Sequence, residues 1–271
     1  LGSLNLVNGE LINNLLLVER PYVGFICVCA SIISFYLSEN SSRFKRTYCI
    51  LAFVFPLYIL LISARMALIS WMIIAAVYFI FYLKINYVKK IGTIFLGSIF
   101  IVGIVFTNEN LSKRFFTKEK ISLNNEGLKD LEPRVIIWNC AFDIFNQPDF
   151  NRLLGTQSVV KATDKLVSCY KEDNGNHDRR NYFVSSKFNT HNQYLDVFLT
   201  NGFIGIILMI IFWVITFFDA KKSYLTLGLF LALSFFMIVE NVLYRQSGVL
   251  LFSLILVFMQ LFFFFKSRAA I

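Results

Sequence analysis

The sequence predicts an all-α polytopic membrane protein, and three observations carry that prediction. Hydrophobic residues make up 57% of the 271 residues, and 31 residues are Phe, whereas only 16% are charged. Apolar runs long enough to cross a bilayer recur along the chain. The charged residues are clustered between those runs. Because lipid offers the backbone no hydrogen-bond partner, each span is expected to be a helix.

Seven spans are expected, most of them short for a bilayer crossing. They cover residues 22–38, 47–63, 66–83, 91–106, 194–218, 223–240 and 247–265. They divide the chain into three parts. These are an N-terminal transmembrane part with four spans (1–106), a long loop (107–190) and a C-terminal transmembrane part with three spans (191–271).

Basic residues predict the orientation of the spans. They gather in four places that share one side of the membrane: Arg43, Lys45 and Arg46; Lys84, Lys89 and Lys90; Lys221 and Lys222; Lys266 and Arg268. The positive-inside rule makes this side the cytoplasm. The loop 107–190 is then expected outside the cytoplasm; it holds 13 Lys and Arg and 11 Asp and Glu, and long loops are translocated largely regardless of charge. The net charge of +9 therefore reports orientation in a lipid bilayer and not a nucleic-acid partner.

The loop is expected to contain a helix at EPRVIIWNCAFDIFNQP, residues 132–148. Pro133 suits its first turn and Pro148 ends it. One stripe of this helix is apolar: Val135, Trp138, Phe142 and Phe145. That stripe either lies on the bilayer surface or packs on the spans.

Two further features of the loop are its polar stretch and its cysteines. Residues 171–181, KEDNGNHDRRN, are expected to be turn-rich, with His177 solvated. Cys140 and Cys169 both lie in the loop and can pair in an oxidising compartment.

Five ionisable residues beside the spans all map to the outer face: Arg20, Arg65, His191, Glu240 and Arg245. Ionisable groups at membrane depth are costly and tend to mark function. Arg65 is expected in the first turn of the third span, with Ser63 as its N-cap, and Arg245 just before the seventh. A helix N-terminus together with an arginine fork suits phosphate oxygens. The alternatives are that the arginines anchor lipid head groups and that Glu240 pairs with Arg245 across the turn.

His191 lies at the start of the fifth predicted span. Thr190 and Gln193 form the pattern of a capping box, which makes His191 the first helical residue and puts Asp196 about one turn inside. An imidazole there can accept a proton and suits a general base, although a lone interfacial histidine is more often an amphipathic anchor. The sequence contains no metal-ligand spacing, phosphate-binding glycine loop or serine nucleophile elbow.

Four groups of residues, in this order, resemble the O-antigen ligase and O-antigen polymerase superfamily of bacterial envelope glycosyltransferases. The first is Ser63-Ala64-Arg65, between two spans. The others are Arg134-x-x-x-Trp138 followed by Gly155; His191-Asn192-x-x-Leu195 followed by Asn201-Gly202-x-x-Gly205; and Glu240–Gly248. Members of that family usually have more spans than seven, so the chain is expected to lack its first several spans.

The resemblance implies an inverting glycosyltransferase that needs no metal and no cofactor. The donor would be a glycan linked to undecaprenyl diphosphate. By this resemblance His191 is the catalytic base, and the donor diphosphate is bound by Arg65, Arg245 and Arg134. The supporting residues are Ser63, Asn192 and Glu240.

The resemblance also implies a place and an acceptor. The enzyme would lie in the bacterial inner membrane, with its active site facing the periplasm, and would serve lipopolysaccharide biosynthesis in the cell envelope. The leading expectation is an O-antigen ligase whose acceptor is lipid A–core. The alternatives are an O-antigen polymerase, a protein O-oligosaccharyltransferase and, more distantly, a transporter of an anionic solute, although the sequence shows no internal repeat.

Overall fold

The structure, a computed structural model, describes residues 18–83, 134–172 and 177–268, with residues 16, 86, 92 and 103 singly. All regular structure within these ranges is helical: nine α-helices and one short 3-10 helix, with no strand. The chain divides into two compact units, each described here by itself. Unit 1 comprises Leu1–Lys118, Asp219–Phe236 and Ile255–Ile271, and unit 2 comprises Glu119–Phe218 and Met237–Leu254.

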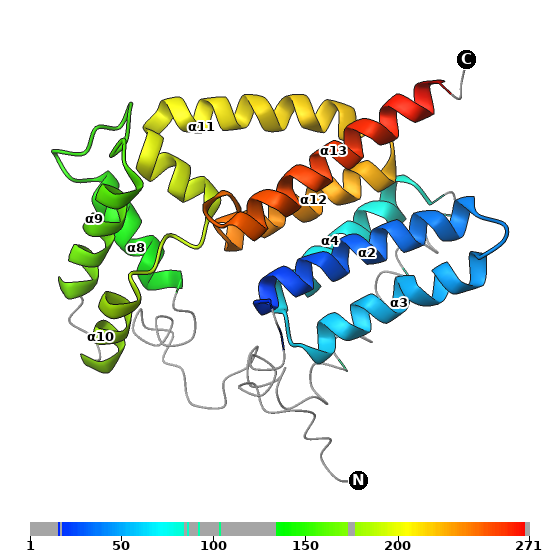
Figure 1. The fold of residues 1–271 in the computed structure, drawn as a ribbon, viewed down its shortest axis with the longest axis horizontal. Coiled ribbons are helices and arrows are strands. Elements are labelled where there is room, and N and C mark those ends of the chain that lie inside the picture. Colours follow the sequence, from blue (N-terminus) through cyan, green and yellow to red (C-terminus); the bar gives the residue numbers. More distant parts are fainter. Residues whose placement is uncertain are drawn as a thin grey trace, which may run out of the picture. The chain divides into compact units, whose positions relative to one another are not determined.

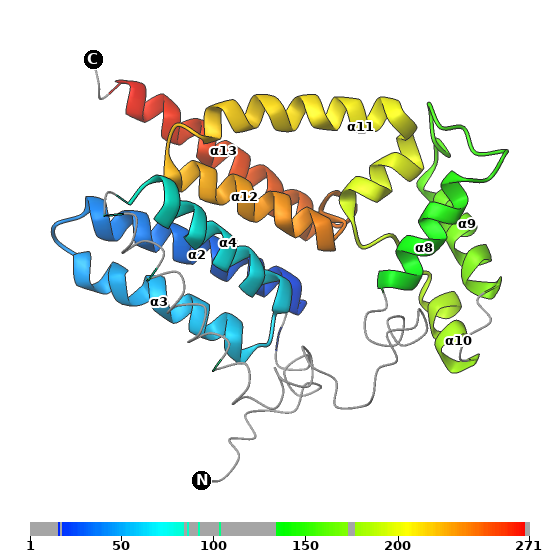
Figure 2. The same ribbon diagram turned by 180° about the vertical axis from the view of Figure 1, so that it is seen from behind.

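Unit 1 is built from helices (Figure 1). They are α2 (Arg20–Asn40), α3 (Lys45–Leu61), α4 (Arg65–Phe81), most of α12 (Tyr224–Val239) and the end of α13 (Gln246–Arg268). A short turn joins α2 and α3, which lie side by side in both views (Figure 2). Aromatic rings join α12 to α2, because Phe236 stacks on Phe25 with ring centroids 4.4 Å apart and meets the edge of Tyr22 at 5.0 Å.

Helices α2 and α4 begin at the same end of unit 1. The starts of α2 and α4 approach so closely that a Cβ on Gly24 would lie 2.7 Å from the Cβ of Ala67. Arg20 and Arg65, the first residues of these two helices, therefore share one end.

The opposite end of unit 1 gathers the basic turns. The turn between α2 and α3 ends at Lys45, the first residue of α3. At the end of α4, the Tyr82 hydroxyl donates a hydrogen bond to the backbone oxygen of Lys221 at 3.2 Å. The ammonium of Lys222 lies 5.6 Å from the ring centre of Phe263, near the end of α13. Basic positions from two separate parts of the chain, Lys45 and Lys221–Lys222, thus lie at one end of the helices.

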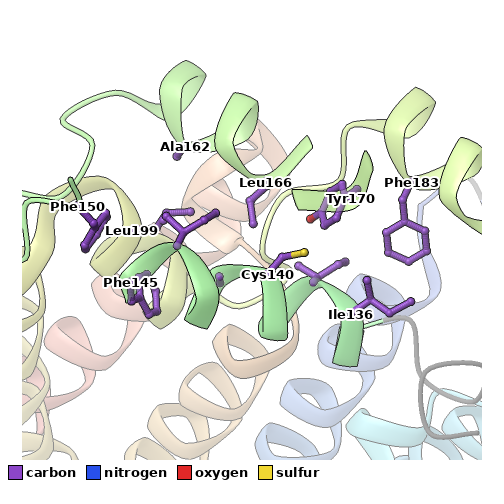
Figure 3. Close-up of a cluster of buried hydrophobic side chains, with 12 residues drawn as sticks. Ile136, Cys140, Phe145, Phe150, Ala162, Leu166, Tyr170, Phe183 and Leu199 are labelled. Atoms are coloured by element: carbon purple, nitrogen blue, oxygen red, sulfur yellow. The ribbon is translucent and has the colours of Figure 1, made fainter. Parts of the chain in front are cut away.

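Unit 2 contains the described part of the loop that was predicted between residues 107 and 190. It is formed by α8 (Arg134–Phe145), α9 (Val159–Glu172), α10 (His177–Ser186), most of α11 (Gln193–Ala220), the 3-10 helix η1 (Val242–Tyr244) and the start of α13. Its core is an apolar cluster that α8, α9, α10 and α11 share (Figure 3). A disulfide between Cys140 and Cys169 joins α8 to α9 inside this cluster.

The predicted loop helix is confirmed as α8, but the predicted stripe was wrong. The buried side chains of α8 are Ile136, Ile137, Cys140, Ala141, Ile144 and Phe145. Phe142 is 51% exposed, and Trp138 is only partly buried. Because α8 is apolar on nearly every side, its sequence carries little contrast between faces, and packing against α9 decides which face is buried.

The described residues of the stretch 171–181 are more regular than predicted. Residues 177–181 form the first half of α10, and His177 is exposed, as expected. Tyr170 on α9 fixes the segment that follows α10, because its hydroxyl donates a hydrogen bond to the Phe188 carbonyl at 3.1 Å. Burial raises the pKa of Tyr170, so this donor keeps its proton.

Helix α11 is broken at Gly202, whose φ of 61° and ψ of −155° are not helical. The break deprives backbone groups of their helical partners, and a turn after α8 replaces them. Phe203 and Ile204 donate their N–H groups to the carbonyls of Arg152 and Leu153, at 2.8 and 3.2 Å. A Cβ on Gly202 would lie 2.5 Å from the backbone of Leu153, so only glycine permits this approach.

Six of the seven predicted spans fall on the helices α2, α3, α4, α11, α12 and α13. The span predicted at 91–106 lies outside the described residues, apart from Gly92 and Gly103. Three described helices are long and apolar enough to cross a membrane: Arg20–Asn40, Gln193–Ala220 and Gln246–Phe265. Arg65–Phe81 and Tyr224–Val239 are shorter apolar helices. The chain is therefore an all-helical membrane protein.

Candidate functional site

His191 lies in unit 2, two residues before α11, with a φ of 43°. It is not the first residue of the helix, so the predicted capping box was wrong. The N-cap is Asn192, whose Oδ1 accepts hydrogen bonds from the N–H groups of Tyr194 and Leu195 at 3.0 and 3.1 Å. His191 therefore stands in the connecting segment, outside the helix.

The residues of the predicted capping box bind another part of the chain instead. The hydroxyl of Thr190 lies within hydrogen-bonding distance of the carbonyl of Asn192, at 2.9 Å, and of Oδ1 of Asn241, at 3.1 Å. Gln193 Oε1 accepts a hydrogen bond from the N–H of Leu243 at 2.7 Å. These tertiary bonds take the place of the local ones and join the start of α11 to the segment between α12 and α13.

The backbone on both sides of His191 is fixed by three side chains, two of which come from distant segments. Trp138 on α8 donates its Nε1–H to the carbonyl of Thr190 at 3.0 Å. The N–H of His191 donates to Asn189 Oδ1 at 3.0 Å, and the N–H of Asn192 donates to Asn241 Oδ1 at 2.6 Å. A left-handed backbone at a residue other than glycine is unfavourable and persists only where its surroundings determine it. These three bonds hold the backbone of His191 in the left-handed conformation.

The imidazole of His191 faces a buried carboxylate. Its Nδ1 lies 3.5 Å from Oε2 of Glu240, and Oε1 of Glu240 lies 4.0 Å from Nη2 of Arg134. The Glu240 side chain is 6% exposed, whereas those of His191 and Arg134 are 20% and 23% exposed. The ring of Phe188 lies beside the imidazole, with centroids 5.7 Å apart. We define His191, Glu240 and Arg134 as the site cluster.

The site cluster has the parts of a general base with an orienting carboxylate. Glu240 on the Nδ1 side leaves Nε2 of His191 to accept a proton. Arg134 is a partly exposed cation beside the same carboxylate and can face an anionic ligand. In the described part of the chain, no group of three or more His, Cys, Asp or Glu residues could hold a metal ion.

The other predicted site residues lie at helix starts. Arg245 immediately precedes α13, as expected, and is partly buried. Arg65 is the first residue of α4, in unit 1. The predicted N-cap role of Ser63 was wrong, because the N-cap of α4 is Ala64 and makes no side-chain cap bond. Ser63 has a φ of 55°, in the left-handed region, whereas an N-cap residue usually has extended backbone angles.

Sequence reasoning missed Asn241, Asn189 and Gln193 as partners of the histidine segment. Asn241 is 2% exposed and directly follows Glu240. The available signal for Asn241 was an amide next to a carboxylate in an otherwise apolar part of the chain, because such polar groups need hydrogen-bond partners when they are buried. The partners of Asn241 are Thr190 and Asn192, about fifty positions away, and no sequence spacing indicates them.

An apolar groove of about 700 Å³ lies along α11 within unit 2. Its walls include Val197, Leu208 and Phe212 of α11, Leu243 of η1 and Phe252 of α13. The groove thus reaches the first turns of α11, which follow His191, and it shares with the site cluster the segment between α12 and α13.

One comparison with known proteins gives a match. The O-antigen ligase family model matches residues 48–210, more than half of the chain. No curated protein and no solved structure matches the chain. Arg65, Arg134 and His191 fall inside the matched range, and Glu240 and Arg245 follow it. This helical membrane protein belongs to the O-antigen ligase family, whose activity is the enzymatic transfer of lipid-linked glycans.

Proposed function

We propose that the protein is an O-antigen ligase that moves a glycan from undecaprenyl diphosphate to a hydroxyl of lipid A–core. The observation that carries this proposal is the site cluster, in which His191 faces Glu240 at 3.5 Å on a backbone fixed by Trp138 and Asn241. Family membership supplies the reaction class, and the cluster supplies a base and a cation for it.

The proposed reaction is a single displacement. Nε2 of His191 takes the proton of the acceptor hydroxyl while its oxygen attacks the anomeric carbon. The bond from that carbon to the diphosphate oxygen breaks, and the carrier diphosphate leaves with the bonding electrons. Attack on the side opposite to the leaving group inverts the anomeric centre.

On the donor side, the guanidinium groups of arginines are proposed to stabilise the leaving diphosphate. The leaving diphosphate gains negative charge as the bond breaks, and fixed cations in a poorly hydrated site stabilise that change more than the ground state. Arg134 lies in the cluster, Arg245 immediately precedes α13 and Arg65 begins α4. Because the arginines supply this charge, the proposed reaction needs no metal. Ser63 and Asn192 are proposed to support the segments that carry Arg65 and His191.

The proposed topology has seven spans, the parts 1–106, 107–190 and 191–271, and a site that faces the periplasm. Two observations support it. Arg20 and Arg65 share one end of unit 1, while basic turns occupy the other. The Cys140–Cys169 disulfide suits a loop in an oxidising compartment.

The groove along α11 offers an apolar path for the polyprenyl chain of the donor. It includes Val197, less than two helical turns from His191, and Leu243, two residues before Arg245. A carrier that lies there would hold its diphosphate beside the basic residues while its hydrocarbon remains out of water.

The proposal is tested with purified protein in lipid vesicles and an undecaprenyl diphosphate glycan. Three acceptors are supplied separately: lipid A–core, lipid-linked repeat units and an acceptor protein. Glycan transfer to lipid A–core alone is the expected result. Transfer only to repeat units or only to protein would replace the ligase with a polymerase or a protein oligosaccharyltransferase.

The base is tested in the same assay with His191→Ala. The rate of transfer should fall about 10²- to 10⁴-fold, the usual contribution of general base catalysis. The exposed His177→Ala is the matched control and should keep the wild-type rate. A wild-type rate for His191→Ala would refute the base assignment.

A further inference from the structure

The turn between α8 and α9, together with the first two residues of α9, carries an exposed apolar tip. The side chains of Leu153, Leu154, Val159 and Val160 are 64%, 42%, 43% and 68% exposed. Four such side chains within eight residues form a patch that water solvates poorly, and patches of this kind mark contacts with lipid or with other proteins.

Five consecutive backbone N–H groups of this turn are bonded within the protein. The N–H groups of residues 153–155 all donate to Asn151, at 2.7 to 3.0 Å. Those of residues 156–157 donate to the carbonyls of Leu199 and Thr200, both at 2.9 Å. Irregular backbone is tolerated in hydrocarbon only where protein satisfies its polar groups. This turn meets that condition for five consecutive N–H groups.

The turn is bonded to the first residues of an apolar helical segment. The carbonyls of Arg152 and Leu153 accept the N–H groups of Phe203 and Ile204, immediately after the break in α11. At 1.5 Å per residue, residues 203–220 extend about 27 Å, close to the thickness of a hydrocarbon core. Phe203 and Ile204 are 46% and 47% exposed, so the apolar tip continues the exposed face of this helix.

Basic residues border the tip. Arg152 precedes it and Lys161 follows it, and both are exposed. Long basic side chains at the edge of an apolar segment extend toward lipid phosphates while their stems stay in the apolar layer. This border and the bonded N–H groups favour a bilayer as the occupant over a protein partner.

We propose that residues 152–160 form a membrane-inserted elbow. The side chains of Leu153, Leu154 and Val160 enter the hydrocarbon of the leaflet that α11 meets at Gly202, and Arg152 and Lys161 bind its phosphates. The break in α11 then marks the membrane boundary, and residues 193–201 lie above the hydrocarbon with the loop. The elbow fixes the depth of unit 2 in the bilayer whatever reaction the site performs.

Photo-crosslinking tests the elbow in the full chain. Leu153 or Val160 is replaced by p-benzoylphenylalanine, and the protein is placed in vesicles of phosphatidylethanolamine and phosphatidylglycerol with radiolabelled acyl chains. The matched control is the same replacement at Tyr182 on α10, which is 59% exposed. Label should enter the protein at 153 and 160 and not at 182. Equal labelling at all three positions, or crosslinks to a second protein chain instead of lipid, would overturn the proposal.

Thiol reactivity gives an independent reading. In a chain whose Cys27, Cys29 and Cys49 are replaced by Ser, Leu153→Cys should react with a sulfonated maleimide roughly tenfold more slowly than Tyr182→Cys, because hydrocarbon excludes charged groups. Detergent should remove the difference. Equal rates in vesicles would place Leu153 in water and end the proposal, and the result does not depend on glycan transfer.

Discussion

At the scale of single residues, the backbone around His191 is determined by other side chains. Three hydrogen bonds fix the peptide groups on either side of it, and their donors or acceptors come from α8, from Asn189 and from Asn241. A catalytic group held in this way loses little entropy when it reacts. In the proposed reaction, the residues that hold His191 therefore matter for the rate as well as for stability.

Replacing Trp138 by Phe separates these two effects. It keeps an aromatic ring but removes the donor to the Thr190 carbonyl. We expect a loss of about 1 kcal/mol in the free energy of unfolding and a fall in kcat of about tenfold or more, because a misplaced base reacts slowly. Trp71→Phe, which loses a 3.0 Å bond to Ser31 in unit 1, is the matched control and should lose stability but not kcat. Equal kcat values for both variants would contradict a positioning role for Trp138.

The arginines of the proposed donor site allow a test of geometry against charge. Lysine keeps the positive charge of Arg245 but lacks the planar fork that binds two phosphate oxygens together. Arg245→Lys should therefore slow transfer about tenfold or more. Arg152→Lys, on the exposed elbow, should keep the wild-type rate in the same assay. A wild-type rate for Arg245→Lys would indicate a lipid anchor instead.

At the scale of elements, the break in α11 and the turn after α8 depend on each other. Gly155 and Gly202 both have positive φ. A Cβ on Gly155 would meet the backbone of residues 200–202, and a Cβ on Gly202 would meet the backbone of Leu153. The sequence showed both glycines, but an apolar run gives no sign that its helix is interrupted. The interruption follows from a partner segment almost fifty positions away, so sequence periodicity alone predicts a continuous span.

Gly202→Ala tests this dependence. The new Cβ would lie 2.5 Å from the Leu153 backbone, and alanine disfavours the left-handed conformation. We expect a loss of about 2 kcal/mol or more in stability, measured as a lower Tm in detergent. Gly103→Ala, whose Cβ would meet nothing within 4 Å, is the control. An unchanged Tm for Gly202→Ala would mean that the close contact between Gly202 and the Leu153 backbone is not needed for stability.

At the scale of the whole molecule, the described helices were largely predictable, and the details of the site were not. Long apolar runs predict spans because lipid leaves the backbone no alternative to helix. Thr190 and Asn192 are both good N-caps, and the choice between them follows from bonds to Asn241 that no local pattern reveals. The sequence motifs pointed to the family and to His191, whereas the contact between His191 and Glu240 became visible only in the structure.

The disulfide connects the fold of unit 2 to the orientation of the whole chain. Replacing Cys140 and Cys169 by Ser should cost about 2–4 kcal/mol, seen as a lower Tm, whereas Cys49→Ser should leave it unchanged. In protein isolated from membranes without reductant, both thiols should resist alkylation until the disulfide is reduced. Free thiols in native membranes would place the loop in the cytoplasm and refute the proposed topology.

The positive φ of His191 decides which substitution leaves its surroundings intact. Glycine adopts that angle without penalty, whereas alanine does not. A His191→Gly enzyme keeps the turn and opens a hole shaped like the lost ring, with Glu240 on one wall. Free imidazole added to the solution should fill that hole and restore turnover, because it replaces the missing side chain as the base.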